Sequence, residues 1–187
     1  MCGGATSASS RPGDPERNDR QAYDALIDSL DVDPARLHPM ESLGGRDGTD
    51  ADAAAERYCA QLAAAAAGRD ADVPEFDVLM LGMGPEGHTA SIFPESPAAY
   101  DERTVFAVHG CPKPPPVRLS MGFAALTAAR EVWLLVAGAE KAPAVALALS
   151  GAGRVQVPAA GPAGRQQTLW LLDEAAAGHL PRDLRRR

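Results

Sequence analysis

Cysteine is scarce in this chain, and long apolar runs are absent. The three cysteines, Cys2, Cys59 and Cys111, are widely spaced and odd in number. This pattern favours free thiols in a reducing cytoplasm over disulfides or a zinc site. No run approaches the roughly 18 apolar residues of a membrane span, and residues 1–10 lack the apolar core of a signal peptide. We therefore expect a cytoplasmic protein that does not cross or bind a membrane.

Positive charge is also in short supply. Lys and Arg number 18 against 25 Asp and Glu, which gives a net charge of −7. Such a balance argues against a nucleic-acid partner, because those proteins carry a basic face. An anionic ligand would then need cations placed locally. Only Lys113 and Lys141 are lysines, and a lysine kept in an arginine-rich chain is a candidate for a role that needs a compact ammonium; chance is the simpler explanation for Lys141 alone.

The chain does carry the pattern of an α/β domain. Its 187 residues are 45% hydrophobic and 23% charged, enough for a globular core. Short apolar runs alternate with segments of helical periodicity or high alanine content, which predicts a parallel or mixed sheet covered by helices. The predicted strands are 76–81, 104–108, 131–137 and 169–172; the predicted helices begin at Asn18, Asp50 and Glu140, with a short helix at 123–129 that follows Arg118–Met121.

The central stretch runs from Asp77 to Pro94. An apolar strand ends at Gly82, and Gly84 and Gly87 precede His88. Glycine lets a backbone turn tightly and leaves N–H groups open to a ligand, and ligands of open α/β sheets bind at the carboxyl ends of strands. An imidazole at such an end is a candidate catalytic base. The alternative is a core or helix-capping histidine whose hydrogen bonds are satisfied.

The same glycines match the dinucleotide-binding pattern G-x-G-x-x-G. The support for a nucleotide is poor, because Pro94 and Pro97 interrupt the crossover helix that this motif requires. A serine hydrolase is a weak alternative, since Ser91 has only His88 as a nearby base and no G-x-S-x-G elbow exists. No Cys/His metal cluster is present in the sequence.

A proline-rich segment at 111–116 predicts a stiff, extended loop. Lys113 and Arg118 flank it, and a rigid loop lowers the entropy cost of holding two cations against a phosphate. The equally simple alternative is an exposed loop with two solvated charges.

Four separate stretches resemble the 6-phosphogluconolactonase family: Asp77–Pro94, Pro112–Ser120, Glu131–Lys141 and Trp170–Ala176. The resemblance covers residues 14–180. It implies an open, Rossmann-like, mostly parallel sheet with helices on both faces, and hydrolysis of 6-phospho-D-glucono-1,5-lactone without metal or organic cofactor, by a monomer.

The resemblance also implies roles for particular residues. His88 would be the general base, and backbone N–H groups near Gly84 to Gly87 would stabilise the oxyanion. Lys113 and Arg118 would hold the 6-phosphate, and Asn18 would line the site. The related glucosamine-6-phosphate deaminases share the glycine turn and histidine but lack the Lys-Pro-Pro loop. An isomerase or deaminase, or an inactive sugar-phosphate-binding remnant, are therefore the alternatives.

The chain departs from the family pattern in three ways. Glu86 stands where aspartate is more usual, and Met121-Gly122 replaces a more common hydroxyl and apolar pair after the arginine. The family's N-terminal strands and glycine-rich phosphate loop have no counterpart, so we expect a disordered or aberrant segment at 1–13, an incomplete lactonase-like domain at 14–180 and a basic tail at 181–187. We hypothesise that residues 1–11 are a frameshifted reading of the gene, which the genomic DNA would test.

Overall fold

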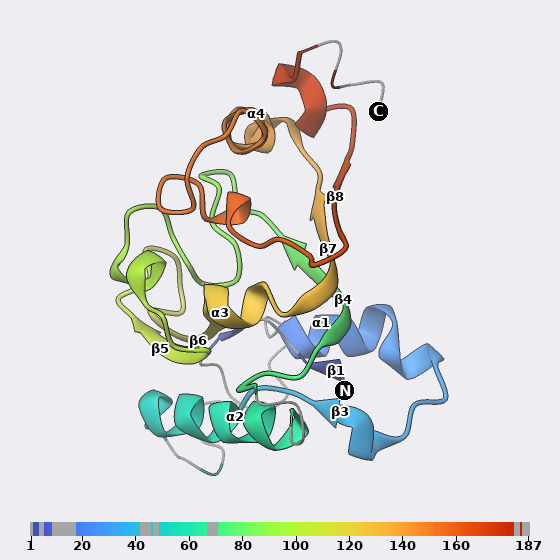
Figure 1. Cartoon of the computed structure of the whole chain (residues 1–187), viewed down its shortest axis with the longest axis vertical. Coiled ribbons are helices and arrows are strands. Elements are labelled where there is room, and N and C mark those ends of the chain that lie inside the picture. Colours follow the sequence, from blue (N-terminus) through green and yellow to red (C-terminus); the bar gives the residue numbers. More distant parts are fainter. Residues whose placement is uncertain are drawn as a thin grey trace. The chain divides into compact units, whose positions relative to one another are not determined.

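The computed structural model of the chain describes residues 2–3, 6–8, 18–41, 46, 49–66, 71–181 and 184. The chain divides into two compact units. The first unit comprises Met1–Pro74 with Thr104–Met121, and the second comprises Glu75–Arg103 with Gly122–Arg187. Figure 1 gives the labels of the helices and strands.

The second unit is built on a parallel sheet in the order β4–β7–β8. Its strands are β4 (Phe76–Gly82), β7 (Ala129–Val136) and β8 (Gln167–Leu172). In the register, Leu79 lies beside Val132, which lies beside Thr168. Three strands that the apolar runs predict are therefore confirmed, and so is the parallel α/β architecture.

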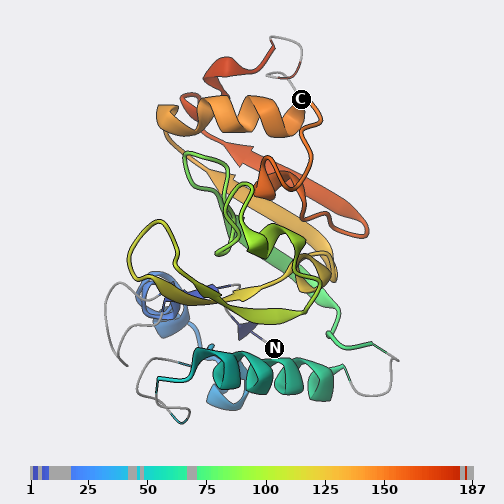
Figure 2. The same ribbon diagram turned by 90° about the vertical axis from the view of Figure 1, so that its left-hand side faces the viewer.

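The two faces of this sheet differ sharply. One face carries buried side chains from alternate positions, and the helices α3 (Phe123–Leu126) and α4 (Ala142–Leu149) lie on one side of the sheet (Figures 1 and 2). The buried residues are Leu79, Leu81, Val132, Leu134 and Val136. On the opposite face Val78, Met80, Leu135 and Leu171 are 41%, 57%, 47% and 46% exposed. Helices over this second face stay a prediction. The described residues of the unit also form the 3₁₀ helices η3 (Pro97–Tyr100), η4 (Ala139–Lys141), η5 (Pro158–Ala160) and η6 (Ala176–His179).

The first unit contains an antiparallel sheet in the order β2–β6–β5 and a short parallel pair, β1–β3. Helix α2 packs on β5 and β6 and buries Tyr58 and Leu62, and Phe106 of β5 is also buried. The elements are β1 (Cys2–Gly3), β2 (Thr6–Ala8), α1 (Asn18–Ala25), η1 (Ile27–Ser29), η2 (Pro34–Arg36), β3 (Leu37–His38), α2 (Ala51–Ala65), β5 (Val105–His109) and β6 (Val117–Met121).

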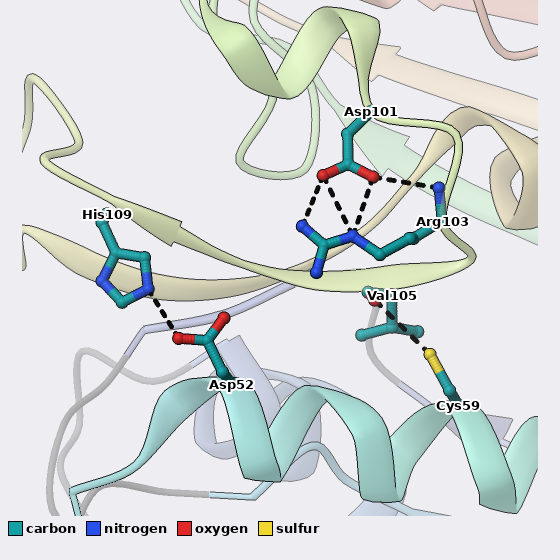
Figure 3. A network of polar contacts seen from close by, with 6 residues as sticks. All are labelled: Asp52, Cys59, Asp101, Arg103, Val105 and His109. Atoms are coloured by element: carbon teal, nitrogen blue, oxygen red, sulfur yellow. Dashed lines mark hydrogen bonds and ion pairs between the residues drawn. The ribbon is translucent and has the colours of Figure 1, made fainter.

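Polar side chains fix α2 at its start and against β5. Asp50 caps the helix, since its carboxylate accepts the N–H of Ala53 at 3.0 Å. Further along, Asp52 pairs with His109 at 3.0 Å, and the Cys59 thiol donates to the Val105 carbonyl at 3.4 Å (Figure 3). The cap at Asp50 agrees with the helix start that the sequence predicts there, and His109 makes its contact with Asp52 at the surface.

Three segments differ from the sequence-based expectations. The periodic segment that begins at Asn18 forms only eight residues of α-helix before a 3₁₀ turn, and neither piece buries a side chain. Arg118–Met121 leads into helix α3 as expected, but these residues belong to a strand, β6, that the sequence did not predict. Cys2–Gly3 and Thr6–Ala8 are strands, which differs from the disorder expected there. The other residues of 1–13, and most of the basic tail at 181–187, lie outside the described residues.

Candidate functional site

The chain turns tightly where β4 ends. The Gly84 N–H donates to the His88 carbonyl at 2.9 Å, and the Gly87 N–H donates to the Gly84 carbonyl at 2.9 Å. A Cβ on Gly84 would lie 2.1 Å from the His88 ring, and Gly87 has φ +90°. Only glycine fits either position. Both amides donate inside the turn, and the oxyanion role expected of N–H groups near Gly84 to Gly87 stays a prediction, as does a place for these glycines beside the substrate.

The His88 imidazole is held on two sides. Its Nδ1 lies 3.2 Å from the Glu86 carboxylate, and its ring stacks on Phe93 with 4.5 Å between centroids and 29° between planes. The side chain is 18% exposed. A carboxylate beside Nδ1 favours the tautomer with the proton on that atom, which leaves the lone pair on Nε2. A base that acts through Nε2 would need this tautomer.

Glu86 is the residue whose role the sequence did not reveal. It stood out there only as a departure from a more usual aspartate. The signal that could have found Glu86 is its position two residues before a histidine, inside a glycine turn. The turn brings its carboxylate back to the Nδ1 atom of the imidazole.

The hydroxyl residues after His88 are structural. Thr89 is fully buried and donates to the Gly82 carbonyl at 2.9 Å, which ties the turn to the end of β4. Ser91 is also fully buried. A nucleophile needs access to its substrate, so this burial argues against a serine hydrolase. The segment then forms a bridge between Thr89 and Ile92 instead of the helix that a dinucleotide motif opens.

The other strand ends at this edge carry a second polar arrangement. Asp173 follows β8, and its carboxylate accepts the N–H of Gly138 at 3.1 Å and that of Ala176 at 2.7 Å. These backbone donors, with a smaller contribution from the charge of Lys141, hold the pKa of Asp173 below its usual value. Because the sheet is parallel, the ends of β7 and β8 lie on the same edge as the His88 turn.

The proline loop connects β5 and β6 in the first unit. The Arg118 guanidinium donates to the carbonyls of Pro114 at 2.8 Å, Lys113 at 3.1 Å and Pro115 at 3.3 Å. Arg118 thus orders the loop that carries Lys113, and these bonds use three of its five N–H donors. Burial raises the pKa of the Cys111 thiol at the start of the loop, and the charge of Arg118 offsets this only in part. The Pro114–Pro115 peptide is cis.

The predicted site residues thus fall into two groups. His88, Gly84 and Gly87 come together in one turn of the second unit. Lys113 and Arg118 share one loop of the first unit, where Asn18 is the exposed first residue of α1.

Comparison with known proteins identifies the family. The model of a family described as glucosamine-6-phosphate isomerases/6-phosphogluconolactonase matches residues 10–170. The chain belongs to this family.

Relatives within the family are close. The chain is 58% identical to a 6-phosphogluconolactonase of Streptomyces coelicolor over 92% of its own length and 67% of that protein's. It is 53% identical to a 6-phosphogluconolactonase of Mycobacterium tuberculosis over 90% of its length and 68% of the relative's. Among solved structures, the 6-phosphogluconolactonase of Trypanosoma brucei is 28% identical, with a TM-score of 0.78 over 96% of this chain and 73% of that one.

The described residues of this family member contain no group of three or more His, Cys, Asp or Glu side chains arranged to hold a metal ion. Within the same residues, no helix combines the length and apolarity needed to cross a bilayer.

Proposed function

We propose that the chain hydrolyses 6-phospho-D-glucono-1,5-lactone to 6-phospho-D-gluconate, a step of the oxidative pentose phosphate pathway. The observation that carries the proposal is the His88 imidazole, held between Glu86 and Phe93 at the carboxyl end of β4. The relatives named 6-phosphogluconolactonase favour this reaction over that of an isomerase or deaminase.

In the proposed mechanism, His88 Nε2 removes a proton from a water molecule as its oxygen attacks the lactone carbonyl carbon. The carbonyl becomes an oxyanion, which then reforms the C=O bond as the bond from that carbon to the ring oxygen breaks. The imidazolium returns its proton to the departing ring oxygen, which becomes a hydroxyl, and the product is the open-chain acid. Glu86 stabilises the imidazolium between these two proton transfers.

The phosphate of the substrate needs cations. We assign it to Lys113 and to the two N–H donors of Arg118 that do not bind the loop carbonyls. A loop already ordered by Arg118 loses little further entropy when it binds an anion. Asn18 is proposed as a further polar contact for the sugar.

A comparison of two histidine variants tests the assignment of the base. His88→Ala should lower kcat for the lactone about 10²–10⁴-fold, the usual contribution of general base catalysis. The measurement is the rate above spontaneous hydrolysis. His109→Ala, which removes an exposed histidine paired with Asp52, should leave the rate unchanged.

Equal catalysed rates in wild type and His88→Ala would remove His88 from the mechanism. Turnover of glucosamine 6-phosphate by the wild type, in place of the lactone, would assign the isomerase or deaminase reaction instead.

A further inference from the structure

The segment that carries His88 has an unusual backbone. Gly87 has φ +90°, Ala90 has φ +50° and Glu95 has φ +56°. Ala90 and Glu95 are not glycines, and a side chain in this left-handed region is disfavoured. Such a conformation persists only where neighbouring contacts over-determine it, and it concentrates at functional sites. Contacts with neighbouring residues must therefore hold this segment in its conformation.

A loop distant in sequence supplies those contacts. Residues 153–161, named here the buttress loop, lie in the same unit as His88. The Ala159 N–H donates to the Gly87 carbonyl at 2.9 Å, and the Glu95 N–H donates to the Val155 carbonyl at 2.9 Å. One bond therefore holds the residue immediately before His88, and the other holds the far end of the segment at Glu95.

Between these two bonds, Val157 packs against the turn. It is 2% exposed, and its Cγ1 lies only 2.8 Å from where a Cβ on Gly87 would be. The Val157 side chain therefore occupies the space that the missing Gly87 side chain leaves. Replacing Val157 with a smaller residue would leave a void beside Gly87, the residue before His88.

The buttress loop is itself anchored. The Val157 N–H donates to the Gly153 carbonyl at 2.9 Å. The Arg154 guanidinium lies over the Phe123 ring at 4.9 Å from its centroid, and a Cβ on Gly161 would lie 2.4 Å from the same ring. Phe123 thus holds the loop near both ends, so the loop can keep the His88 segment in a fixed position.

We propose that the buttress loop positions the His88 imidazole, with Val157 as the positioning residue. The loop acts through the backbone of Gly87 and Glu95. The proposal rests on the proposed function of His88 as the base. An error of about 1 Å in the position of a catalytic group can cost on the order of 10²-fold in rate, so a loosened turn should slow the reaction without weakening substrate binding.

The test compares two buried valines of the second unit. Val157→Ala should lower kcat about tenfold to a hundredfold with KM unchanged, and Val157→Ile should restore much of it. Val132→Ala, in the core of β7 and fully buried, is the matched control and should lower the Tm without changing kcat. Amide hydrogen exchange should accelerate at Gly87–Glu95 in Val157→Ala and not in Val132→Ala.

The outcomes separate this proposal from the one on which it rests. If His88→Ala is inactive while Val157→Ala keeps the kcat of Val132→Ala, the buttress is overturned and the base stands. An equal loss of kcat in Val157→Ala and Val132→Ala would also overturn the buttress proposal, because the loss would then follow from reduced stability alone. If Val157→Ala fails to fold, Arg154→Ala tests the proposal instead. Replacement of this exposed residue should lower kcat several-fold, and an unchanged kcat would refute the proposal.

Discussion

At the scale of single residues, the Glu86 carboxylate close to His88 Nδ1 favours the tautomer that leaves the lone pair on Nε2. The carboxylate lies 3.2 Å from Nδ1, and Phe93 covers one face of the ring. A histidine after a glycine turn was predictable because the residue types and their order are visible in the sequence. The contact of Glu86 was not, since it depends on how the turn folds the side chain back.

Glu86→Gln should lower kcat about tenfold, equivalent to roughly 1.4 kcal/mol of transition-state stabilisation. The neutral amide keeps the shape of the side chain but no longer stabilises the imidazolium. Steady-state kinetics with the lactone should show this loss in kcat and little change in KM. Glu86→Asp keeps the charge and should fall between wild type and Glu86→Gln; a loss as large as that of the glutamine variant would mean that the distance matters more than the charge.

At the scale of elements, the parallel strands were predictable and the antiparallel hairpin was not. The runs that became β4, β7 and β8 are almost continuously apolar, which is typical of strands in a parallel sheet. Val117–Met121 shows no such run, because Arg118 and Ser120 interrupt it, although Ser120 is fully buried. The proline loop before it is also longer than the usual two-residue hairpin turn.

The link between the ends of β7 and β8 should depend on pH. Backbone donors lower the pKa of Asp173 in the folded state, so its contribution to stability is present above the ordinary carboxyl pKa and lost as the pH falls through the lowered value. Asp173→Asn should therefore have a lower Tm than wild type near neutral pH, and the difference should shrink below about pH 4.

Thermal unfolding across pH, followed by circular dichroism, measures this difference. Glu174→Gln is the matched control, because it removes an adjacent exposed carboxylate and should change the Tm little at any pH. A difference for Asp173→Asn that persists unchanged at low pH would show that the ionised carboxylate is not what holds the strand ends.

At the scale of the whole molecule, the sequence did not reveal the two units. The second unit is assembled from two stretches, 75–103 and 122–187, with strands of the first unit between them. Composition does not change at these boundaries, so a pass along the chain finds none. The overall charge was easier to interpret: with a net charge of −7, any affinity for a phosphate must come from cations placed locally.

Lys113→Ala should raise the KM for the lactone more than it lowers kcat, because a group that binds the phosphate equally in ground and transition states affects KM alone. Arg36→Ala is the control, since it removes an exposed positive charge from the same unit and should leave KM unchanged. A loss in kcat with KM unchanged would mean that Lys113 acts on the reacting centre instead.

The bonds between the buttress loop and the His88 segment join backbone atoms only. Backbone groups are the same in almost every residue, so these bonds place no demand on the side chains of Val155 or Glu95. Gln156, which is exposed, is similarly free to change. Substitutions at Val155 and Gln156 can therefore be made without moving the histidine, and a library intended to alter solubility or attach a label can be directed to these two positions first.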